Sequence, residues 1–262
     1  MPHVERRFCR TRLGHVHCVL AGDGAQTPLV LLHQTPRSVD EFAEVIPRLA
    51  RERRVIAIDT PGYGCSDRVP GQPSVEDYAG AVLEALTSLG VDRFVPVGHH
   101  TGEIVAVELA AAAPDRVERV ALSGPLDLDA AGREYLKPFF RQWTIAPDGS
   151  HLTDKFGKFL QWVPDPDLVQ RLVVDLFRAG TASEQGHFAT TFYRMEERLP
   201  HVRCPALLIY GARDAFSTPA RAALHRAAFR PVTEVTIDAG VFAPNENPDA
   251  YASAVLDWLR SS

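Results

Sequence analysis

The stretch Val95-Pro96-Val97-Gly98-His99-His100-Thr101-Gly102-Glu103-Ile104 decides the fold. Its apolar start predicts a strand, and the residues after Gly102 predict a helix. Gly98 and Gly102 permit a sharp turn between the two elements. His100 stands in the middle of that turn, and a strand–turn–helix unit of this kind needs further elements to pack beside it.

Short apolar runs alternate with helical stretches on both sides of this segment. They are apolar throughout rather than alternating, which suits strands buried on both faces of a parallel sheet. The residues from Val4 to Leu20 predict an additional hairpin that turns near Gly14. The six runs are 29–32, 55–58, 94–97, 120–122, 206–209 and 235–237.

The alternation is interrupted once, over about eighty residues between Leu122 and Ala206. We therefore expect an α/β core over residues 1–126 and 201–262, with a helical cap, or lid, over 127–200. Most aromatic side chains of this insertion are expected to form the core of the cap itself. They are Tyr135, Phe139, Phe140, Trp143, Phe156, Phe159, Trp162, Phe177, Phe188, Phe192 and Tyr193.

Five segments, which follow one another along the chain in the order typical of the family, resemble motifs of the α/β-hydrolase superfamily. The resemblance is to the branch of capped epoxide hydrolases, haloalkane dehalogenases and C–C hydrolases in particular. Residues 98–102 are similar to the G-x-Ser-x-G nucleophile elbow. The others are the H-G-x-P-like loop at 33–36, the D-x-P-G-x-G-x-S-D-like turn at 59–67, the G-x-x-D-like strand end at 211–214 and the G-H-F-x-x-x-E-x-P-like segment at 240–248. The resemblance implies an α/β-hydrolase fold, a mostly parallel twisted sheet flanked by helices, with a helical cap.

Three positions depart from the family pattern. His100 occupies the place of the nucleophile, Val241 the place of the general-base histidine, and Gln34 the second position of the H-G loop. A Ser-His-Asp mechanism needs a histidine within hydrogen-bond reach of the serine. The sequence therefore predicts that this machinery is absent.

His100 reaches further from the backbone than a serine would, into space that Val241 leaves apolar. We expect one imidazole nitrogen to meet Asp214 in a contracted His–Asp dyad, with the other facing the pocket. The backbone N–H groups of Thr35 and Thr101 would stabilise an oxyanion or enolate. We favour His100 as a general base over a nucleophile.

Other polar residues near these motifs have less specific interpretations. The resemblance implies that His33 supports the oxyanion loop by hydrogen bonds. His99 is expected to point away from the pocket. Glu103 is either a second partner of His100 or a carboxylate favoured by the helix dipole. Asp127 occupies an alternative acid position of the superfamily, although the motif around Asp214 is more complete.

Trp143, His187, Phe139 and Tyr193 are the cap residues that we considered for contact with a substrate, with Trp143 and His187 the preferred pair. For each one separately, burial within the cap is the simpler interpretation.

No metal site and no cofactor is predicted. His33, His100, Glu103 and Asp214 lack the HxxxH or HxH spacing that is typical of zinc ligands. The pair His15 and His17 has that spacing, but it lies in the hairpin, where we expect exposed strand histidines. The four cysteines form no CxxC pair. Cys9 and Cys18 flank the turn of the hairpin symmetrically and are expected to be free thiols in a reducing compartment.

Length and charge limit the partners. The chain has 262 residues and a net charge of −5, which disfavours nucleic acid as a partner. No apolar run reaches the roughly 18 residues that a membrane span needs. The N-terminus has no apolar stretch of the signal-peptide type, so we expect a cytoplasmic monomer or homodimer with a small-molecule substrate.

The sequence thus predicts an α/β-hydrolase-fold enzyme acting on a small, largely apolar carbonyl compound, such as an ester, lactone or diketone. Two alternatives stay open. One is a cofactor-free lyase, isomerase or cyclase that uses His100 as general base. The other is a small-molecule binder without catalysis, because a fold alone does not imply a function.

Overall fold

The computed structural model describes residues 4–261. Its centre is one eight-stranded sheet in the order β1-β2-β4-β3-β5-β6-β7-β8. The pairs β1–β2 and β2–β4 are antiparallel, and the remaining pairs are parallel. The strands are β1 (Val4–Thr11), β2 (Gly14–Ala21), β3 (Leu29–Leu32), β4 (Val55–Ile58), β5 (Val95–His99), β6 (Val120–Ser123), β7 (Ala206–Gly211) and β8 (Val232–Ile237).

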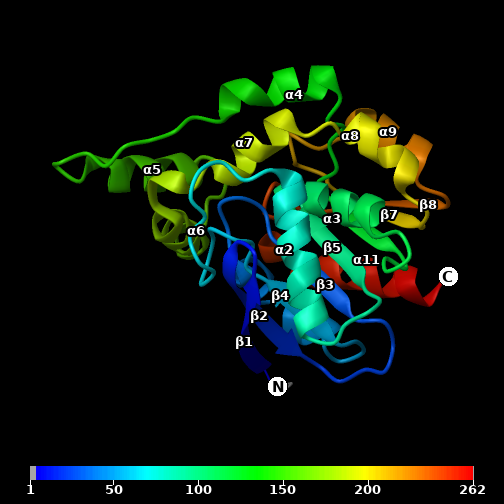
Figure 1. Cartoon of the computed structure of the whole chain (residues 1–262). Helices are drawn as coiled ribbons and strands as arrows, with labels where there is room; N and C mark the ends of the chain where they lie inside the picture. Colours follow the sequence, from blue (N-terminus) through cyan, green and yellow to red (C-terminus); the bar gives the residue numbers. More distant parts are fainter. Residues whose placement is uncertain (1–3, 262) are drawn as a thin grey trace.

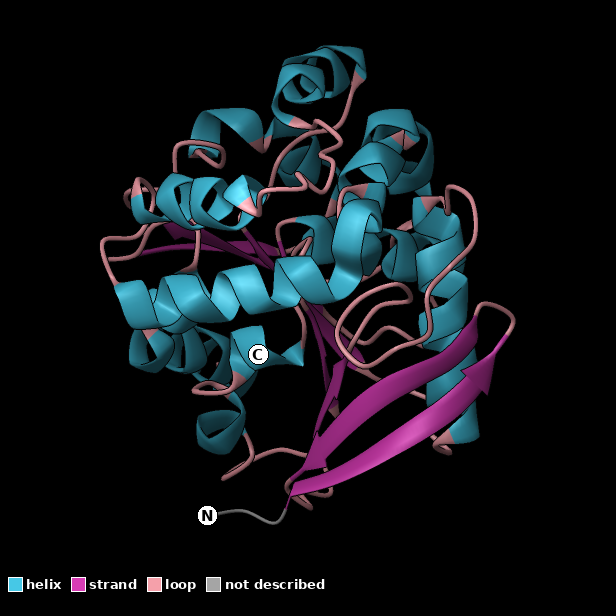
Figure 2. Ribbon diagram, turned by 90° about the vertical axis from the view of Figure 1, so that its left-hand side faces the viewer, coloured by secondary structure: helices cyan, strands magenta, loops and turns pink. Residues whose placement is uncertain are grey.

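Helices cover both faces of this sheet, and the predicted fold class is confirmed. Figure 2 shows the β1–β2 hairpin as a long ribbon that leaves the body of the sheet. One apolar core lies between the sheet and helices α2 and α3, and a second lies between the sheet and α1 and α11. The core helices are η1 (Val39–Phe42), α1 (Ile46–Leu49), α2 (Val75–Ser88), α3 (Thr101–Ala112), η5 (Pro219–Arg221), α9 (Ala223–Ala228), α10 (Ala243–Glu246) and α11 (Pro248–Arg260).

Local sequence signals explain several of these elements. All four residues of β3 and of β4 are buried, as expected for strands covered on both faces. At the start of α2, Ser74 and Asp77 form a reciprocal capping box, which satisfies two backbone N–H groups that the helix leaves unpaired.

The segment between β6 and β7 is helical throughout most of its length, and in Figure 1 its helices lie above and to the left of the sheet. We call this segment the cap; its predicted limits of 127 and 200 stay a prediction. Its elements are α4 (Ala130–Leu136), η2 (Lys137–Phe139), α5 (Ser150–Leu160), α6 (Pro166–Ala179), η3 (Gly180–Ala182), α7 (Gln185–Phe192), α8 (Met195–Arg198) and η4 (Leu199–His201).

The expectation that most cap aromatics form a closed core is wrong. Of the eleven, only Tyr193 is buried; Phe139, Trp162 and Phe192 are exposed and the others are half-buried. Among the buried apolar side chains of the cap are aliphatic ones of α6, which pack with Phe242 of the core; they are Leu168, Val169, Leu172 and Val173. The helices lie over the core without enclosing one another, so large rings at their surfaces keep contact with solvent.

Ion pairs hold α6 on the core. Arg37 Nε lies 2.9 Å from Asp175 Oδ2, and the hydroxyl of Ser38 donates to the other oxygen of Asp175. Arg171 Nη1 lies 2.7 Å from Glu44 Oε1. Arg37 and Asp175 are both buried, so this contact between cap and core is screened little by solvent.

The hairpin histidines differ from expectation in one respect. His15 is exposed, as predicted, but His17 is buried and its Nδ1 lies 2.8 Å from Asp59 Oδ2. His15 and His17 are alternate residues of β2 and therefore point to the same face of the strand. The face alone does not explain why only His17 is buried. The acid partner comes from a turn 42 residues away, which no local spacing reveals. Cys9 and Cys18 are buried free thiols.

Candidate active site

The turn between β5 and α3 places His100 at the carboxyl edge of the sheet. Its backbone has φ 47° and ψ −113°, a conformation that side-chain-bearing residues rarely adopt. A Cβ at position 98 would lie 2.2 Å from the carbonyl oxygen of Gly102, and a Cβ at position 102 would lie 2.0 Å from that of Leu32. Both glycines are therefore required by close backbone approach, and the tight turn lifts His100 out of the strand.

His100 meets Asp214, which follows β7. His100 Nε2 lies 3.0 Å from Asp214 Oδ2, although the carboxylate lies off the direction of the ring N–H and the contact does not form an aligned hydrogen bond. The Oδ1 atom of Asp214 accepts from the backbone N–H groups of Phe216 and Ser217 at 2.9 and 3.3 Å. The His100 ring lies over Gly124, where an added Cβ would come within 2.9 Å of it. The two side chains thus form a close ion pair of fixed orientation.

The electrostatic surroundings favour the charged form of both partners. Burial alone would lower the pKa of His100, but the negative charges of Asp214, Glu41 and Glu103 raise it overall. Burial alone would raise the pKa of Asp214, but His100 and the N–H of Phe216 lower it overall. His100 is therefore a stronger base than a free imidazole, and it gives up its proton only above its raised pKa.

The ring of His99 lies edge-on against the ring of His100, with centroids 4.6 Å apart, so the two side chains do not diverge as expected; the hydrogen bonds of His99 are structural. Its Nε2 donates to the carbonyl oxygen of Val241 at 2.9 Å, and its Nδ1 accepts from the hydroxyl of Ser123 at 3.0 Å. Burial, with the charge of His100, lowers the pKa of His99 to about 3. The ring is neutral at every physiological pH and ties the 239–248 segment to the end of β6.

Val241 fills the position where the family pattern has a histidine. Its half-buried side chain packs against the apolar cluster of α6 and Phe242. Its carbonyl oxygen also accepts from Gln34 Nε2 at 3.3 Å. This position therefore supplies an apolar surface beside the site and no titratable group.

The loop after β3 is held by buried polar contacts. His33 Nδ1 donates to the carbonyl oxygen of Gln34 at 2.9 Å, and His33 Nε2 accepts from the N–H of Thr60 at 3.0 Å. The N–H and the side-chain amide of Gln34 both donate to the Glu41 carboxylate, at 2.8 and 2.7 Å. Burial raises the pKa of Glu41 to about 7. His33 thus connects two loops from within the protein.

Thr35 and Thr101, the two expected oxyanion donors, lie against each other. The N–H of Thr35 donates to Thr101 Oγ1 at 2.6 Å, and the Thr101 hydroxyl donates to Thr35 Oγ1 at 3.1 Å. The Thr35–Pro36 peptide bond is cis. The sequence did not reveal that the Thr101 side chain accepts a hydrogen bond from the N–H of Thr35.

A small cavity adjoins these threonines, and helix α7 of the cap closes it. Its volume is about 10 Å³, close to the smallest space that holds one water. A Cβ at Gly186 would lie 2.1 Å from Thr35 Oγ1, and the N–H of Gly186 donates to the Tyr63 hydroxyl at 2.7 Å. Gly186 and Thr190 of α7 thus form one wall of this space. The lining residues are His33, Thr35, Thr60, Tyr63, Val75, Tyr78, Thr101, Val105, Gly186 and Thr190.

The predicted cap contacts Trp143 and His187 pack within the cap. Trp143 Nε1 donates to the hydroxyl of Ser183 at 2.9 Å. His187 Nδ1 lies 2.9 Å from a Glu184 oxygen, and its ring stacks on Phe140 with centroids 4.4 Å apart. Contact of these two residues with a substrate stays a prediction.

Glu103 has a partner that sequence reasoning missed. Its Oε1 lies 2.7 Å from Nε2 of His225, a residue of α9. The other ring nitrogen, Nδ1, lies 2.7 Å from Asp127 Oδ1. A signal did exist, because Glu103 and Asp127 are two acids near the elbow without an assigned cation, but no motif points to His225.

One group of metal-type side chains occurs within residues 4–261, formed by His17, Asp59 and Cys65. Asp59 already accepts from His17 Nδ1 and the N–H of Cys65 at 2.8 Å, and from the N–H of Val39 at 2.6 Å. Arg178 Nη1 lies 3.0 Å from the Cys65 sulfur. These contacts explain the group without an ion, and it lies outside the elbow.

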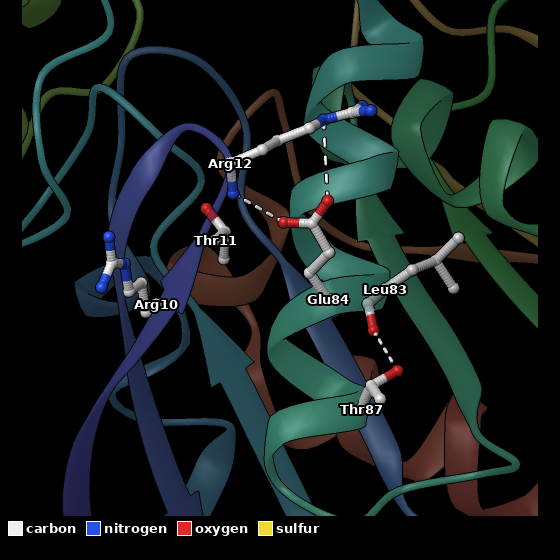
Figure 3. Close-up of a pocket in the computed structure, with 6 residues that line it drawn as sticks. All are labelled: Arg10, Thr11, Arg12, Leu83, Glu84 and Thr87. Atoms are coloured by element: carbon white, nitrogen blue, oxygen red, sulfur yellow. Dashed lines mark hydrogen bonds and ion pairs between the residues drawn. The ribbon is translucent and has the colours of Figure 1, made fainter.

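A larger surface groove lies between the β1–β2 hairpin and α2 (Figure 3). Its volume is about 630 Å³, and it is lined by Arg10, Thr11, Arg12, Leu83, Glu84 and Thr87. Glu84 accepts from the backbone N–H of Arg12 at 2.7 Å, so this acid is engaged in holding the hairpin. The groove lacks His100 and Asp214, and we place the candidate active site at the elbow.

Among the described residues, no helix combines the length and the apolar character that crossing a membrane requires.

Comparison with known proteins places the chain among hydrolases. A family profile described as the alpha/beta hydrolase fold matches residues 27–248. A 2-hydroxy-6-oxononadienedioate/2-hydroxy-6-oxononatrienedioate hydrolase of Pseudomonas putida is 27% identical over 283 residues, which cover 97% of this chain and 96% of that protein. The crystal structure of a hydrolase from Pseudomonas aeruginosa PA01 superposes with a TM-score of 0.80 at 26% identity, covering 97% and 98% of the two chains.

The dihydrolipoyllysine-residue acetyltransferase component of an acetoin cleaving system, also from Pseudomonas putida, is 28% identical over 254 residues. The match covers 92% of this chain but only 65% of that longer protein.

Proposed function

Because this chain belongs to the α/β-hydrolase fold family, we propose that it hydrolyses small, largely apolar carbonyl compounds with a His100–Asp214 centre in place of Ser-His-Asp. The observation that supports this most directly is the 3.0 Å contact between His100 Nε2 and Asp214 Oδ2 at the elbow. Relatives named as hydrolases support the reaction class.

In the proposed step His100 acts as general base. Nε2 faces Asp214, so Nδ1 accepts a proton from water as the water oxygen bonds to the substrate carbonyl carbon. The bond to the leaving group then breaks, and the proton on Nδ1 passes to that group. One water is consumed, an acid and a leaving group with its proton are formed, and His100 returns to its starting state.

The carbonyl oxygen gains negative charge during this step and needs donors. The N–H of Thr101, at the start of α3, and the N–H of Thr35 are the proposed donors. Thr35 becomes available once the hydroxyl of Thr101 turns away from it. The apolar side chains of Val241 and Phe242 suit the apolar part of the substrate.

The same base also suits proton abstraction without water, which would make the protein a lyase, isomerase or cyclase. The specific observation in favour is that the nucleophile position of the elbow holds an imidazole, that of His100, and no hydroxyl, so no acyl-enzyme of the serine type forms there. A third alternative is binding without turnover.

One experiment separates the three. The protein is assayed on aryl esters, lactones and β-diketones in ¹⁸O-water, and the diketones are also incubated in D₂O. Label in the acid product supports hydrolysis. Deuterium exchange or cleavage without ¹⁸O supports proton transfer and overturns the hydrolytic proposal. Saturable binding with neither reaction supports the binder.

The variant His100→Ala is expected to lose roughly 10²- to 10⁴-fold in rate. His201→Ala, which changes an exposed histidine, is the matched control and should keep full activity. Full activity in His100→Ala would remove His100 from the mechanism.

A further inference from the structure

A second histidine lies between two carboxylates beside the elbow. His225 Nε2 is 2.7 Å from Glu103 Oε1, and His225 Nδ1 is 2.7 Å from Asp127 Oδ1. His225 and Glu103 are completely buried, and the Asp127 side chain keeps 14% exposure. The proposed hydrolytic step uses none of these three groups.

The contacts define the charge of this cluster. An imidazole donates from both nitrogens only when it is protonated, and here each nitrogen faces a carboxylate oxygen. Burial would lower the pKa of His225, but Glu103 and Asp127 raise it to about 9. With Glu103 ionised, one imidazolium between two carboxylates leaves a net charge of −1. Burial opposes that ionisation and raises the pKa of Glu103 overall, whereas the charge of His225 lowers it. Glu103 Oε2 has no hydrogen-bond partner.

Both acids belong to the segments that hold the His100 ring. Glu103 is three residues along α3 from His100, and its N–H donates to the His100 carbonyl oxygen at 2.8 Å. Asp127 is three residues after Gly124, on which the ring lies. The negative charge of Glu103 also favours the protonated form of His100.

We propose that Glu103, His225 and Asp127 form a positioning network that fixes the two segments around His100 and places negative charge on the side of its ring. The inference rests on the proposed function, in which His100 is the base. A purely structural role explains the cluster less well, because apolar side chains would join α3 to α9 without the desolvation cost of three buried ions.

The other ionisable groups that act on His100 come from different elements. Asp214 follows β7 and Glu41 lies in η1. Asp214 is negatively charged, whereas Glu41, with its pKa raised to about 7, acts on the ring only in its ionised form. His99, at the end of β5, is neutral because its pKa is lowered to about 3. His225 itself also contacts Phe229, with ring centroids 6.4 Å apart.

The test is a titration of the histidine rings by NMR, with ¹⁵N-labelled histidine in the intact protein and no substrate. In Glu103→Gln, the network charge changes from −1 to 0 while His225 stays protonated. The His100 midpoint is therefore expected to move to lower pH. The His225 midpoint should also fall from about 9, because one of its two carboxylates is gone.

The same helix offers a matched control. Glu108 is buried and pairs with Arg198 at 2.8 Å, but it lies eight residues from His100, about 12 Å along the helix. Glu108→Gln removes a buried carboxylate from α3 in the same way, although its partner Arg198 is 32% exposed. Its His100 midpoint should stay at the wild-type value.

Activity gives the second measurement. Misplacement of a catalytic group by about 1 Å costs on the order of 10²-fold. We expect kcat of Glu103→Gln at its alkaline plateau to fall roughly tenfold to a hundredfold with KM little changed, while the ascending limb of its pH profile moves to lower pH. If Glu103→Gln does not fold, Asp127→Asn provides the same change of charge at the more exposed end of the network.

A His100 midpoint that stays at the wild-type value in the folded variant overturns the proposal, whatever the activity. If the midpoint moves but no substrate is turned over even by the wild type, the network stands and the proposed function fails. The two failures are therefore distinguishable.

Discussion

His100 and His225 are both histidines held against buried carboxylates, at the same edge of one sheet. His100 has one close carboxylate partner and a side chain that is still 15% exposed. His225 has two partners, one on each nitrogen, and no exposure. A histidine with a free nitrogen is able to exchange a proton with a substrate, whereas one with both nitrogens engaged holds its proton. The number of engaged nitrogens, rather than the presence of an acid, separates the two roles.

The largest expected effect that tests this contrast is on stability. His225→Ala leaves the buried Glu103 and the partly exposed Asp127 without a cation, and loss of the partner of a buried charge typically costs about 3–5 kcal/mol. His100→Ala should cost less than half as much, because Asp214 keeps two backbone N–H donors. Urea unfolding of both variants at pH 7 measures the difference. An equal loss of unfolding free energy in the two variants would show that His100 and His225 contribute alike to stability.

The pH dependence of stability gives a somewhat smaller effect. The folded-state pKa of His225, about 9, exceeds its ordinary value of 6.5. Its contribution is therefore complete below about pH 6.5 and is lost as pH rises through about 9, amounting to roughly 3 kcal/mol.

The measurement is the free energy of unfolding of the wild type minus that of His225→Gln, from pH 6 to pH 10. The subtraction removes the titration of other groups, such as the buried Cys18 and Cys204. A difference that stays constant across this range would contradict a protonated His225.

Asp214→Asn is expected to lower the plateau of kcat/KM roughly 10²-fold, about 2.7 kcal/mol, because the ring loses its orienting carboxylate. It also removes a negative charge that raises the pKa of His100. The rising limb of the pH profile should therefore move to lower pH even as the plateau falls. A limb that keeps its wild-type position would show that Asp214 acts only on orientation.

The smallest effect concerns the backbone. His100 has φ 47°, which a glycine adopts without strain. His100→Gly should therefore be more stable than His100→Ala by about 1 kcal/mol. Thermal unfolding of the two variants measures it, and an alanine variant of equal or greater stability would show that the turn relaxes when the ring is absent.

Much of the fold follows from the sequence because its signals are local. Continuous apolar runs mark the buried strands, and Ser74 with Asp77 marks the start of α2. The meeting of His100 with Asp214 also follows, because the resemblance places both at carboxyl ends of parallel strands. Their catalytic roles stay a prediction.

The remaining features depend on contacts between distant segments. His225 is 122 residues from Glu103, and His17 is 42 residues from Asp59. Neither pairing leaves a spacing pattern in the chain, because each forms only when two loops pack together. The burial of the cap aromatics was predicted wrongly for a related reason. A high content of aromatic residues shows that a segment is apolar, but it does not show which other segments will pack over it.

The hydroxyl of Thr101 affects how strongly a carbonyl ligand binds at the N–H of Thr35. It occupies the N–H of Thr35 before a substrate arrives, so the protein carries its own competitor for that donor. Under the proposed function, a carbonyl oxygen exchanges one hydrogen bond for another there and gains little in the ground state. The gain comes when the oxygen becomes charged, because a charge-assisted bond is roughly twice as strong as the neutral one it replaces. The Thr101 hydroxyl therefore weakens the binding of a neutral carbonyl more than it weakens the binding of the transition state. This difference favours turnover of the substrate over tight binding.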